Sequence, residues 1–163
     1  MSRASFLDRD GVINRKAPEG QYVTRWEEMH FLPDAATAIA LLNRAGFRVI
    51  VVSNQRCVAK GLVTAVEVES LHQRMCDALA RAGAGIDAVY YCPHRPDEGC
   101  SCRKPKTLLF QKASVDFHLD LKKCVFIGDK QTDEDAARRI GCGFIRVKTN
   151  TSEIISKEPV STT

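Results

Sequence analysis

The sequence has no long apolar run. Its longest apolar stretch, around residues 49–52, is far shorter than the about 20 residues that span a membrane. The N-terminal segment, MSRASFLDRDG, also lacks the apolar core of a secretory signal. We therefore expect a cytoplasmic protein that has no membrane partner.

The sequence also lacks a strong excess of one charge. The formal net charge is +4, and the basic residues are scattered without interleaved aromatic residues. Faces that bind nucleic acid usually concentrate Lys and Arg on one surface. We therefore expect no nucleic-acid partner, whereas a small anionic substrate is consistent with this charge.

A disulfide framework is not expected either, because the seven cysteines are an odd number and the expected compartment is reducing. Three of them lie with a histidine in the segment 92–102, CPHRPDEGCSC, which we call the zinc loop. Three thiolates and one imidazole complete a tetrahedral zinc site and leave no position for water, as in structural sites. The segment predicts a structural Zn²⁺, with chance proximity of these residues as the alternative. The predicted ligands are Cys92, His94, Cys100 and Cys102.

Short apolar runs alternate along the chain with segments of helical periodicity. Thr64 and Glu67 have the spacing of a capping box, and Gly46 follows another helical segment as a C-cap signal. The alternation predicts an α/β fold, a doubly wound parallel sheet with helices on both faces. We expect strands at 4–7, 47–52, 86–91, 125–127 and 144–147, and helices at 35–45, 64–82, 106–118 and 132–140.

The length of 163 residues fits one domain with one substantial core. We expect this domain to cover residues 1–150, with the zinc loop at 92–102 inside it. Residues 151–163 are polar and are expected to form a C-terminal tail. We expect the protein to act as a monomer.

Polar residues follow four of the expected strands, at 8–11, 53–55, 92–104 and 128–129. Ligands of open parallel sheets bind outside the carboxyl ends of the strands, so these segments should meet at one crevice. In the first of them, Asp8 suits a nucleophile or metal ligand, and Asp10 suits an acid/base because Gly11 permits an unusual backbone path. A solvated acidic turn is the alternative for this segment alone.

The other strand ends supply groups that suit phosphate. Asp129 could hold Mg²⁺ together with Asp8, since this ion usually takes one or two carboxylates plus a substrate phosphate. Asp133 lies on the next helical turn, where it either caps the helix or acts directly. The remaining groups are the hydroxyl of Ser53 and the cations Arg103 and Lys104. Together they form a set of groups for phosphoryl transfer.

The order and spacing of these motifs, from LDRDGVIN to GDKQTDEDAARRIG, resemble the haloacid dehalogenase (HAD) superfamily of phosphatases. The segments FLDRDGVIN, VVSNQ, YYCPHRPDEGCSCRKP and IGDKQTDEDAA look like two close groups within it. These are the D,D-heptose 1,7-bisphosphate 7-phosphatases and the histidinol-phosphate phosphatase domains. The resemblance implies a Rossmann-like HAD fold without a large cap domain, and a zinc-binding loop.

The resemblance also implies a role for each motif residue. Asp8 would be the nucleophile that becomes an aspartyl-phosphate, and Asp10 would protonate the leaving alkoxide and then activate water. The implied Mg²⁺ ligands are Asp8, the Asp10 carbonyl and Asp129. The implied phosphoryl contacts are Ser53 and Lys104, and the implied substrate contacts are Asn54, Arg103 and Lys130.

The substrate is less clearly indicated by the resemblance. The segments QYV and AKG are similar to the heptose group, whereas CRKPK followed by two leucines is closer to the histidinol group. Arg56 and Cys57 replace the Ser-Gly usual in the heptose group, so Arg56 could read a second anionic group. A small phosphorylated metabolite is expected, with the heptose bisphosphate favoured over histidinol phosphate and a third phosphate ester left open. Two readings of other classes are a zinc-stabilised, non-catalytic binding module and a zinc-ribbon nucleic-acid binder.

Overall fold

The computed structural model describes residues 1–148 and, for the backbone alone, residues 156–160. One sheet runs through the molecule in the strand order β3-β2-β1-β4-β5-β6, and β1 to β5 pair in parallel. The predicted doubly wound parallel sheet is therefore confirmed. The parallel strands are β1 (Ala4–Leu7), β2 (Arg48–Asn54), β3 (Ala88–Cys92), β4 (Val125–Gly128) and β5 (Gly143–Val147).

A sixth strand lies in the segment that we expected to be a tail. This strand, β6 (Ser156–Val160), pairs antiparallel with β5. The segment Ser-Lys-Glu-Pro-Val does not predict a strand, because it contains a proline and two charges, which rarely occur in strands except at a sheet edge. The remainder of the expected tail, residues 151–155 and 161–163, lies outside the described residues.

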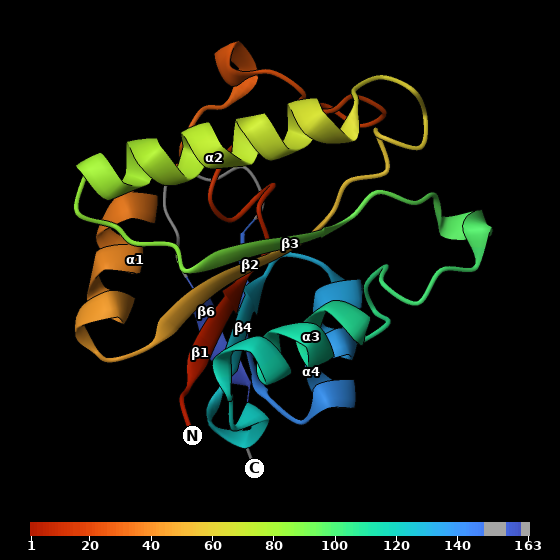
Figure 1. The fold of residues 1–163 in the computed structure, drawn as a ribbon. Coiled ribbons are helices and arrows are strands. Elements are labelled where there is room, and N and C mark those ends of the chain that lie inside the picture. The colour runs from red at the N-terminus through yellow and green to blue at the C-terminus, as the bar shows by residue number, and fades with distance from the viewer. Residues whose placement is uncertain (149–155, 161–163) are drawn as a thin grey trace.

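Helices cover both faces of the sheet, α1 and α2 on one side and α3 and α4 on the other (Figure 1). Each lies within two residues of its predicted bounds, and α2 begins after Thr64, whose side chain accepts a hydrogen bond from the Glu67 amide as predicted. The helices are α1 (Ala35–Arg44), α2 (Ala65–Arg81), α3 (Leu108–Phe117) and α4 (Gln131–Ile140). Short 3₁₀ helices lie at η1 (Trp26–Glu28), η2 (Pro96–Glu98) and η3 (Leu121–Lys123).

The two sides of the sheet have separate apolar cores. Under α3 and α4, Phe110 packs edge-on against Phe6 with ring centroids 5.0 Å apart, and Phe126 continues this aromatic cluster. The opposite core is aliphatic, and its helical members are Ile39, Leu71, Met75 and Leu79. Because both faces of β1, β2 and β4 are buried, their backbones are fixed up to the residues where the polar segments begin.

The chain changes direction in the sheet at β1. From β1 it proceeds outward to β2 and β3, and it then returns to form β4 and β5 on the other side of β1. The carboxyl ends of β1 and β4 therefore flank a topological switch point, where α/β sheets bind ligands. The backbone amide of Asp8 donates to the carbonyl of Ile127 (3.1 Å) at this point, so Asp8 lies beside the start of the Asp129 loop.

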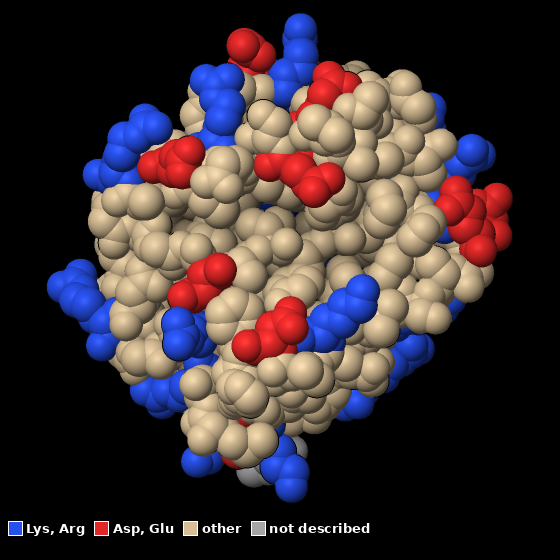
Figure 2. All heavy atoms as spheres, in the orientation of Figure 1, with Lys and Arg blue, Asp and Glu red and all other residues tan. Residues whose placement is uncertain are grey.

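On the face of the molecule shown in Figure 2, cationic and anionic side chains are interspersed. Within the described residues, no helix is long and apolar enough to cross a membrane.

Candidate active site

A buried lysine lies between two buried carboxylates at the switch point. Lys104 Nζ is 3.1 Å from Asp8 Oδ1 and 2.9 Å from Asp133 Oδ1, and it donates to the Val52 carbonyl (2.8 Å). The Lys104 side chain is 2% exposed and that of Asp133 is 0% exposed. A buried ammonium group requires such partners, because it has lost its water. The structure thus brings the predicted Asp8 and Lys104 into direct contact.

The charges at this point determine the ionisation of Asp8. Burial raises the pKa of this carboxyl, but Lys104 and Lys130 outweigh that effect and lower it to about 2. Burial in turn lowers the pKa of Lys104, but Asp133 and Asp8 raise it above its ordinary value. Lys130 approaches from the solvent side, with Nζ 3.4 Å from Asp8 Oδ2. Asp8 is therefore ionised at neutral pH, as a nucleophile or a metal ligand must be.

Asp129 completes an acidic cluster next to Asp8. One carboxylate oxygen from each of Asp8, Asp129 and Asp133 lies within 4.8 Å of the other two. The turn after β1 presses closely against this cluster, since a Cβ at Gly11 (φ +88°) would lie 2.5 Å from Asp129 Oδ2. Lys16 Nζ lies 3.0 Å from the same oxygen. Hard carboxylate oxygens in this arrangement are the ligands that Mg²⁺ prefers, so the donor set fits that ion.

Asp133 was predicted either to cap α4 or to act directly. Its Oδ2 accepts hydrogen bonds from the backbone amides of Asp129 (3.2 Å) and Lys130 (3.3 Å), so it caps the helix. A Cβ at Gly128 would lie 2.5 Å from the same Oδ2, so only glycine fits there. Asp133 thus joins the Asp129 loop to Lys104 by one carboxylate.

Asp10 is held by hydrogen bonds on both carboxylate oxygens. Oδ1 accepts from Arg9 Nε (3.1 Å), Arg9 Nη2 (2.9 Å) and Asn14 Nδ2 (2.9 Å). Oδ2 accepts from Gln55 Nε2 (3.1 Å). The side chain of Asp10 remains 23% exposed and lies at the cavity described below, so a substrate can reach it.

Ser53 and Asn54, the last two residues of β2, form hydrogen bonds with different partners. The hydroxyl of Ser53 is buried and accepts from Gln55 Nε2 (2.6 Å). The amide of Asn54 is engaged at both ends by the backbone of Lys104: its Oδ1 accepts from the Lys104 amide (3.0 Å) and its Nδ2 donates to the Lys104 carbonyl (3.3 Å). Asn54 thus fixes the chain that carries Lys104, a role that the sequence did not predict.

A cavity of about 960 Å³ opens at these strand ends. Asp10, Asn54, Arg103, Lys104 and Lys130 line it, together with the loop 16–23 and the end of the zinc loop. The structure therefore gathers the predicted acid/base and the predicted substrate contacts around one space. Lys104 and Lys130, which line this cavity, contact Asp8 of the acidic cluster.

The four predicted zinc ligands also come together. His94 Nδ1 is 3.4 Å from Cys92 Sγ and 3.2 Å from Cys102 Sγ, and Cys92 Sγ is 3.6 Å from Cys100 Sγ and 2.8 Å from Cys102 Sγ. Around a tetrahedral zinc with bonds of about 2.0–2.3 Å, ligand atoms lie about 3.5–3.8 Å apart. The cluster is slightly tighter than that and has the right donors, so it could hold zinc.

Known proteins are similar to this chain in sequence and fold. A HAD-hydrolase-like family model matches residues 101–159. A D-glycero-beta-D-manno-heptose-1,7-bisphosphate 7-phosphatase from Pseudomonas aeruginosa is 38% identical over 150 residues, which cover 91% of this chain and 83% of the relative. The D-glycero-D-manno-heptose-1,7-bisphosphate 7-phosphatase of Thermosynechococcus vestitus is 41% identical over 157 residues, covering 90% of this chain and 79% of the relative. This chain belongs to the HAD-like phosphatases.

Solved structures agree with this assignment. The crystal structure of D,D-heptose 1,7-bisphosphate phosphatase from B. bronchiseptica, complexed with magnesium and phosphate, matches with a TM-score of 0.84 and 35% identity. The match covers 93% of this chain and 83% of that chain. The enzyme from Burkholderia thailandensis matches with a TM-score of 0.61 and 30% identity over 86% of this chain and 74% of that chain.

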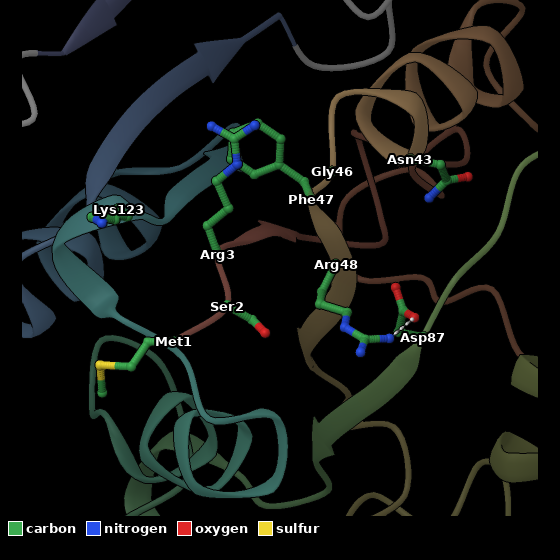
Figure 3. Close-up of a pocket in the computed structure, with 9 residues that line it drawn as sticks. All are labelled: Met1, Ser2, Arg3, Asn43, Gly46, Phe47, Arg48, Asp87 and Lys123. Carbon is green, nitrogen blue, oxygen red and sulfur yellow. Dashed lines mark hydrogen bonds and ion pairs between the residues drawn. The ribbon is translucent and has the colours of Figure 1, made fainter.

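A second hollow of this HAD-like phosphatase lies at the opposite ends of β1 and β2 (Figure 3). Two of its cations already have partners: Arg48 points to Asp87 and lies 3.3 Å from it, while Arg3 donates to the Ala45 carbonyl and stacks on Phe47. The acidic cluster and the predicted motifs all lie at the other ends of the strands. The cavity at the carboxyl ends of the strands is therefore the candidate active site.

Sequence reasoning missed the buried support of Asp10. Arg9 is 0% exposed, and its Nη1 lies 3.1 Å from Nε2 of His72, which is buried on α2. An arginine between two aspartates in a polar turn is normally read as solvated, and only the fold reveals that it points inward. Burial lowers the pKa of His72 to about 3, and the guanidinium of Arg9 adds to this shift. His72 is thus neutral and accepts the hydrogen bond from Arg9.

The low pKa of His72 predicts a pH dependence of stability. Between about pH 6.5 and pH 3 the unfolded chain binds a proton that the folded chain excludes, so the free energy of unfolding should fall as pH decreases, by about 1.4 kcal/mol per pH unit from this group. The variant His72→Gln can still accept from Arg9 but cannot titrate. Urea unfolding between pH 6.5 and pH 4.5 should give a correspondingly shallower slope for His72→Gln than for the wild type.

The exposed His30 provides the matched control, and His30→Gln should keep the wild-type slope. An unchanged slope in His72→Gln would show that His72 does not cause the acid sensitivity.

Proposed function

We propose that this HAD-like phosphatase hydrolyses the 7-phosphate of D-glycero-D-manno-heptose 1,7-bisphosphate through an aspartyl-phosphate on Asp8. The observation that carries the proposal is the contact between the buried Lys104 ammonium, which lines the cavity, and the ionised carboxylate of Asp8. Such a carboxylate is a competent nucleophile, and the adjacent cation can neutralise charge on the phosphoryl oxygens.

The reaction would proceed in two displacements. In the first, an oxygen of Asp8 attacks phosphorus, the bond from phosphorus to the sugar oxygen breaks, and Asp10, which starts this step protonated, donates its proton to the leaving alkoxide. In the second, Asp10 removes a proton from water, which attacks the same phosphorus and releases inorganic phosphate from Asp8. Both carboxylates return to their initial states, and one water is consumed. The hydrogen bonds from Arg9 and Gln55 would keep Asp10 oriented for both steps.

A magnesium ion would be held by Asp8, the backbone carbonyl of Asp10 and Asp129. When bound, it supplies positive charge that offsets the phosphate oxygens and brings substrate and nucleophile together. The hydroxyl of Ser53 and the ammonium of Lys104 would contact the transferred phosphoryl group. The proposed contacts to the rest of the substrate are Asn54, Arg103 and Lys130.

The choice of substrate rests on the relatives. The Pseudomonas aeruginosa and Thermosynechococcus vestitus proteins, and the B. bronchiseptica structure, all carry the heptose 1,7-bisphosphate phosphatase name. Histidinol phosphate remains the comparison substrate because CRKPK departs from the continuation usual in the heptose group.

We further propose that the chain forms a single phosphatase domain that acts as a cytoplasmic monomer and that extends beyond the expected bounds of 1–150, because β6 belongs to the same sheet. Cys92, His94, Cys100 and Cys102 would hold a structural Zn²⁺, which organises a loop that has little regular structure of its own. Free thiolates that bind zinc suit a reducing compartment. The loop leads directly into Arg103 and Lys104, so the ion would fix the path of both cations.

Phosphate release tests the proposed activity. At equal Mg²⁺, the wild type should turn over heptose 1,7-bisphosphate faster than histidinol phosphate, because only the bisphosphate presents a second anion to the cationic cavity. Asp8→Asn should lose at least about 10³-fold of turnover on both substrates and on p-nitrophenyl phosphate, since the nucleophile is removed. Circular dichroism should show its fold intact. Activity that survives Asp8→Asn would refute the nucleophile assignment, and a preference for histidinol phosphate would refute the substrate.

Zinc removal tests the proposed role of the loop. Cys100→Ser should lose zinc, measured by metal analysis, and should raise KM for the bisphosphate and open the loop to proteolysis, because Arg103 loses its anchor. Calorimetry should find Mg²⁺ binding largely retained, since Asp8 and Asp129 directly follow β1 and β4 and lie outside the zinc loop. Cys76→Ser, which is also a half-buried cysteine but lies outside the cluster, is the control and should behave as wild type. Loss of Mg²⁺ binding together with zinc would mean that zinc supports the whole domain.

A further inference from the structure

Arg56 lies on the wall of the active-site cavity, on the turn after β2. Its Nε donates to the hydroxyl of Tyr22 (2.7 Å), and its guanidinium carbon lies 5.7 Å from the centre of the Tyr22 ring. Tyr22, on the loop 16–23, therefore holds the Arg56 side chain in place at the cavity. Within the described residues its two terminal nitrogens have no hydrogen-bond partner, so they can bind a ligand.

Arg103 lines the same cavity, one residue before Lys104. Its Nη1 is buried and has no hydrogen-bond partner in the described part of the chain. A buried donor without an acceptor is costly, and in a ligand cavity it points to an acceptor that arrives with the ligand. Burial lowers the pKa of Arg103, and the charge of Arg56 acts in the same direction, so the two guanidinium groups repel each other.

These two arginines differ from the cavity cations that have carboxylate partners, and unlike Lys106 and Arg139 they do not donate to a backbone carbonyl in the described residues. Lys16 is paired with Asp129, and Lys130 with Asp8. By contrast, neither Arg56 nor Arg103 forms an ion pair with a carboxylate in residues 1–148. Two neighbouring guanidinium groups that share one cavity without a counter-ion form a site for an anion, and phosphate suits their bidentate geometry.

We propose that Arg56 and Arg103 together bind the phosphate group of the substrate that is not cleaved, with Tyr22 positioning Arg56. This inference rests on the proposed function, because only a bisphosphate places a second anion in the cavity while the first is at Asp8. Lys104 and Arg103 would then divide the two phosphates between them, since they follow each other in the chain and one reaches the buried floor while the other lines the cavity. A monophosphate cannot use the pair.

Substrate discrimination tests the proposal. Arg56→Gln should lower kcat/KM for heptose 1,7-bisphosphate by about 10-fold to 100-fold more than it lowers kcat/KM for p-nitrophenyl phosphate, as expected for one charged hydrogen-bonding partner. Tyr22→Phe should cause a smaller loss of the same kind, mainly in KM. The control is Arg139→Gln, which removes the same charge from the same cavity, although the Arg139 guanidinium donates to the Pro105 carbonyl. In this variant the ratio of kcat/KM for the bisphosphate to kcat/KM for p-nitrophenyl phosphate should change less than about two-fold.

The possible outcomes distinguish a failure of the Arg56 and Arg103 phosphate site from a failure of the proposed activity. If the wild type hydrolyses the bisphosphate and Arg56→Gln keeps the wild-type ratio, or Arg139→Gln changes it equally, the arginine pair is wrong while the proposed function stands. If the wild type hydrolyses p-nitrophenyl phosphate but not the heptose bisphosphate, the proposed substrate is wrong.

If the heptose bisphosphate is not hydrolysed, inhibition of p-nitrophenyl phosphate hydrolysis still tests whether Arg56 and Arg103 bind a second phosphate. Glucose 1,6-bisphosphate should inhibit the wild type at least about 10-fold more strongly than glucose 6-phosphate, and Arg56→Gln should abolish this difference. Equal inhibition of the wild type by the two sugars would overturn the proposal.

Discussion

The ammonium of Lys104, enclosed between Asp8 and Asp133, is the interaction on which the rest of the site depends. A charge without water is tolerated only if its partners are fixed in place. Asp8 is fixed by β1, and Asp133 by its two hydrogen bonds to the start of α4. Lys104 in turn keeps Asp8 ionised while it is buried, which is the state required for attack on phosphorus. The same contact therefore stabilises the fold and would prepare Asp8 for its proposed role as nucleophile.

The lysine has no strand or helix of its own to position it, and the surrounding loops do so instead. Asn54 binds the Lys104 backbone at both its amide and its carbonyl, which ties the loop to the end of β2. The cysteine cluster ends at Cys102, two residues before Lys104, so a zinc ion bound there would restrict the conformations of the backbone that leads to Lys104. The loop thereby places two cations at different depths, with Lys104 at the buried floor and Arg103 on the cavity wall.

The parts of the site that follow from strand ends were predictable from the sequence. Asp8, Asp129 and Lys104 were identified because buried runs in a parallel sheet must end at one edge. Two side-chain contacts were not predictable, because each depends on the direction in which a side chain leaves an irregular loop. These are the contact of the inward-pointing Arg9 with His72 and the hydrogen bond from Arg56 to Tyr22. Asn54 lines the cavity, as its proposed contact with substrate requires, but its bonds to the Lys104 backbone were not predictable because only the fold brings these groups near. The strand β6 was missed because its composition resembles a solvated tail.

The central claim, that Lys104 exists to balance two buried carboxylates, is tested most directly by a double-mutant cycle on the free energy of unfolding. Lys104→Met should cost about 3 kcal/mol or more in urea unfolding at pH 7, because it leaves Asp133 buried without its cation. Adding Asp133→Asn should then restore at least about 1 kcal/mol, although Asp133→Asn alone should destabilise the wild type. If the losses in the free energy of unfolding of Lys104→Met and Asp133→Asn simply add in the double variant, Lys104 does not balance Asp133 and the central claim is wrong.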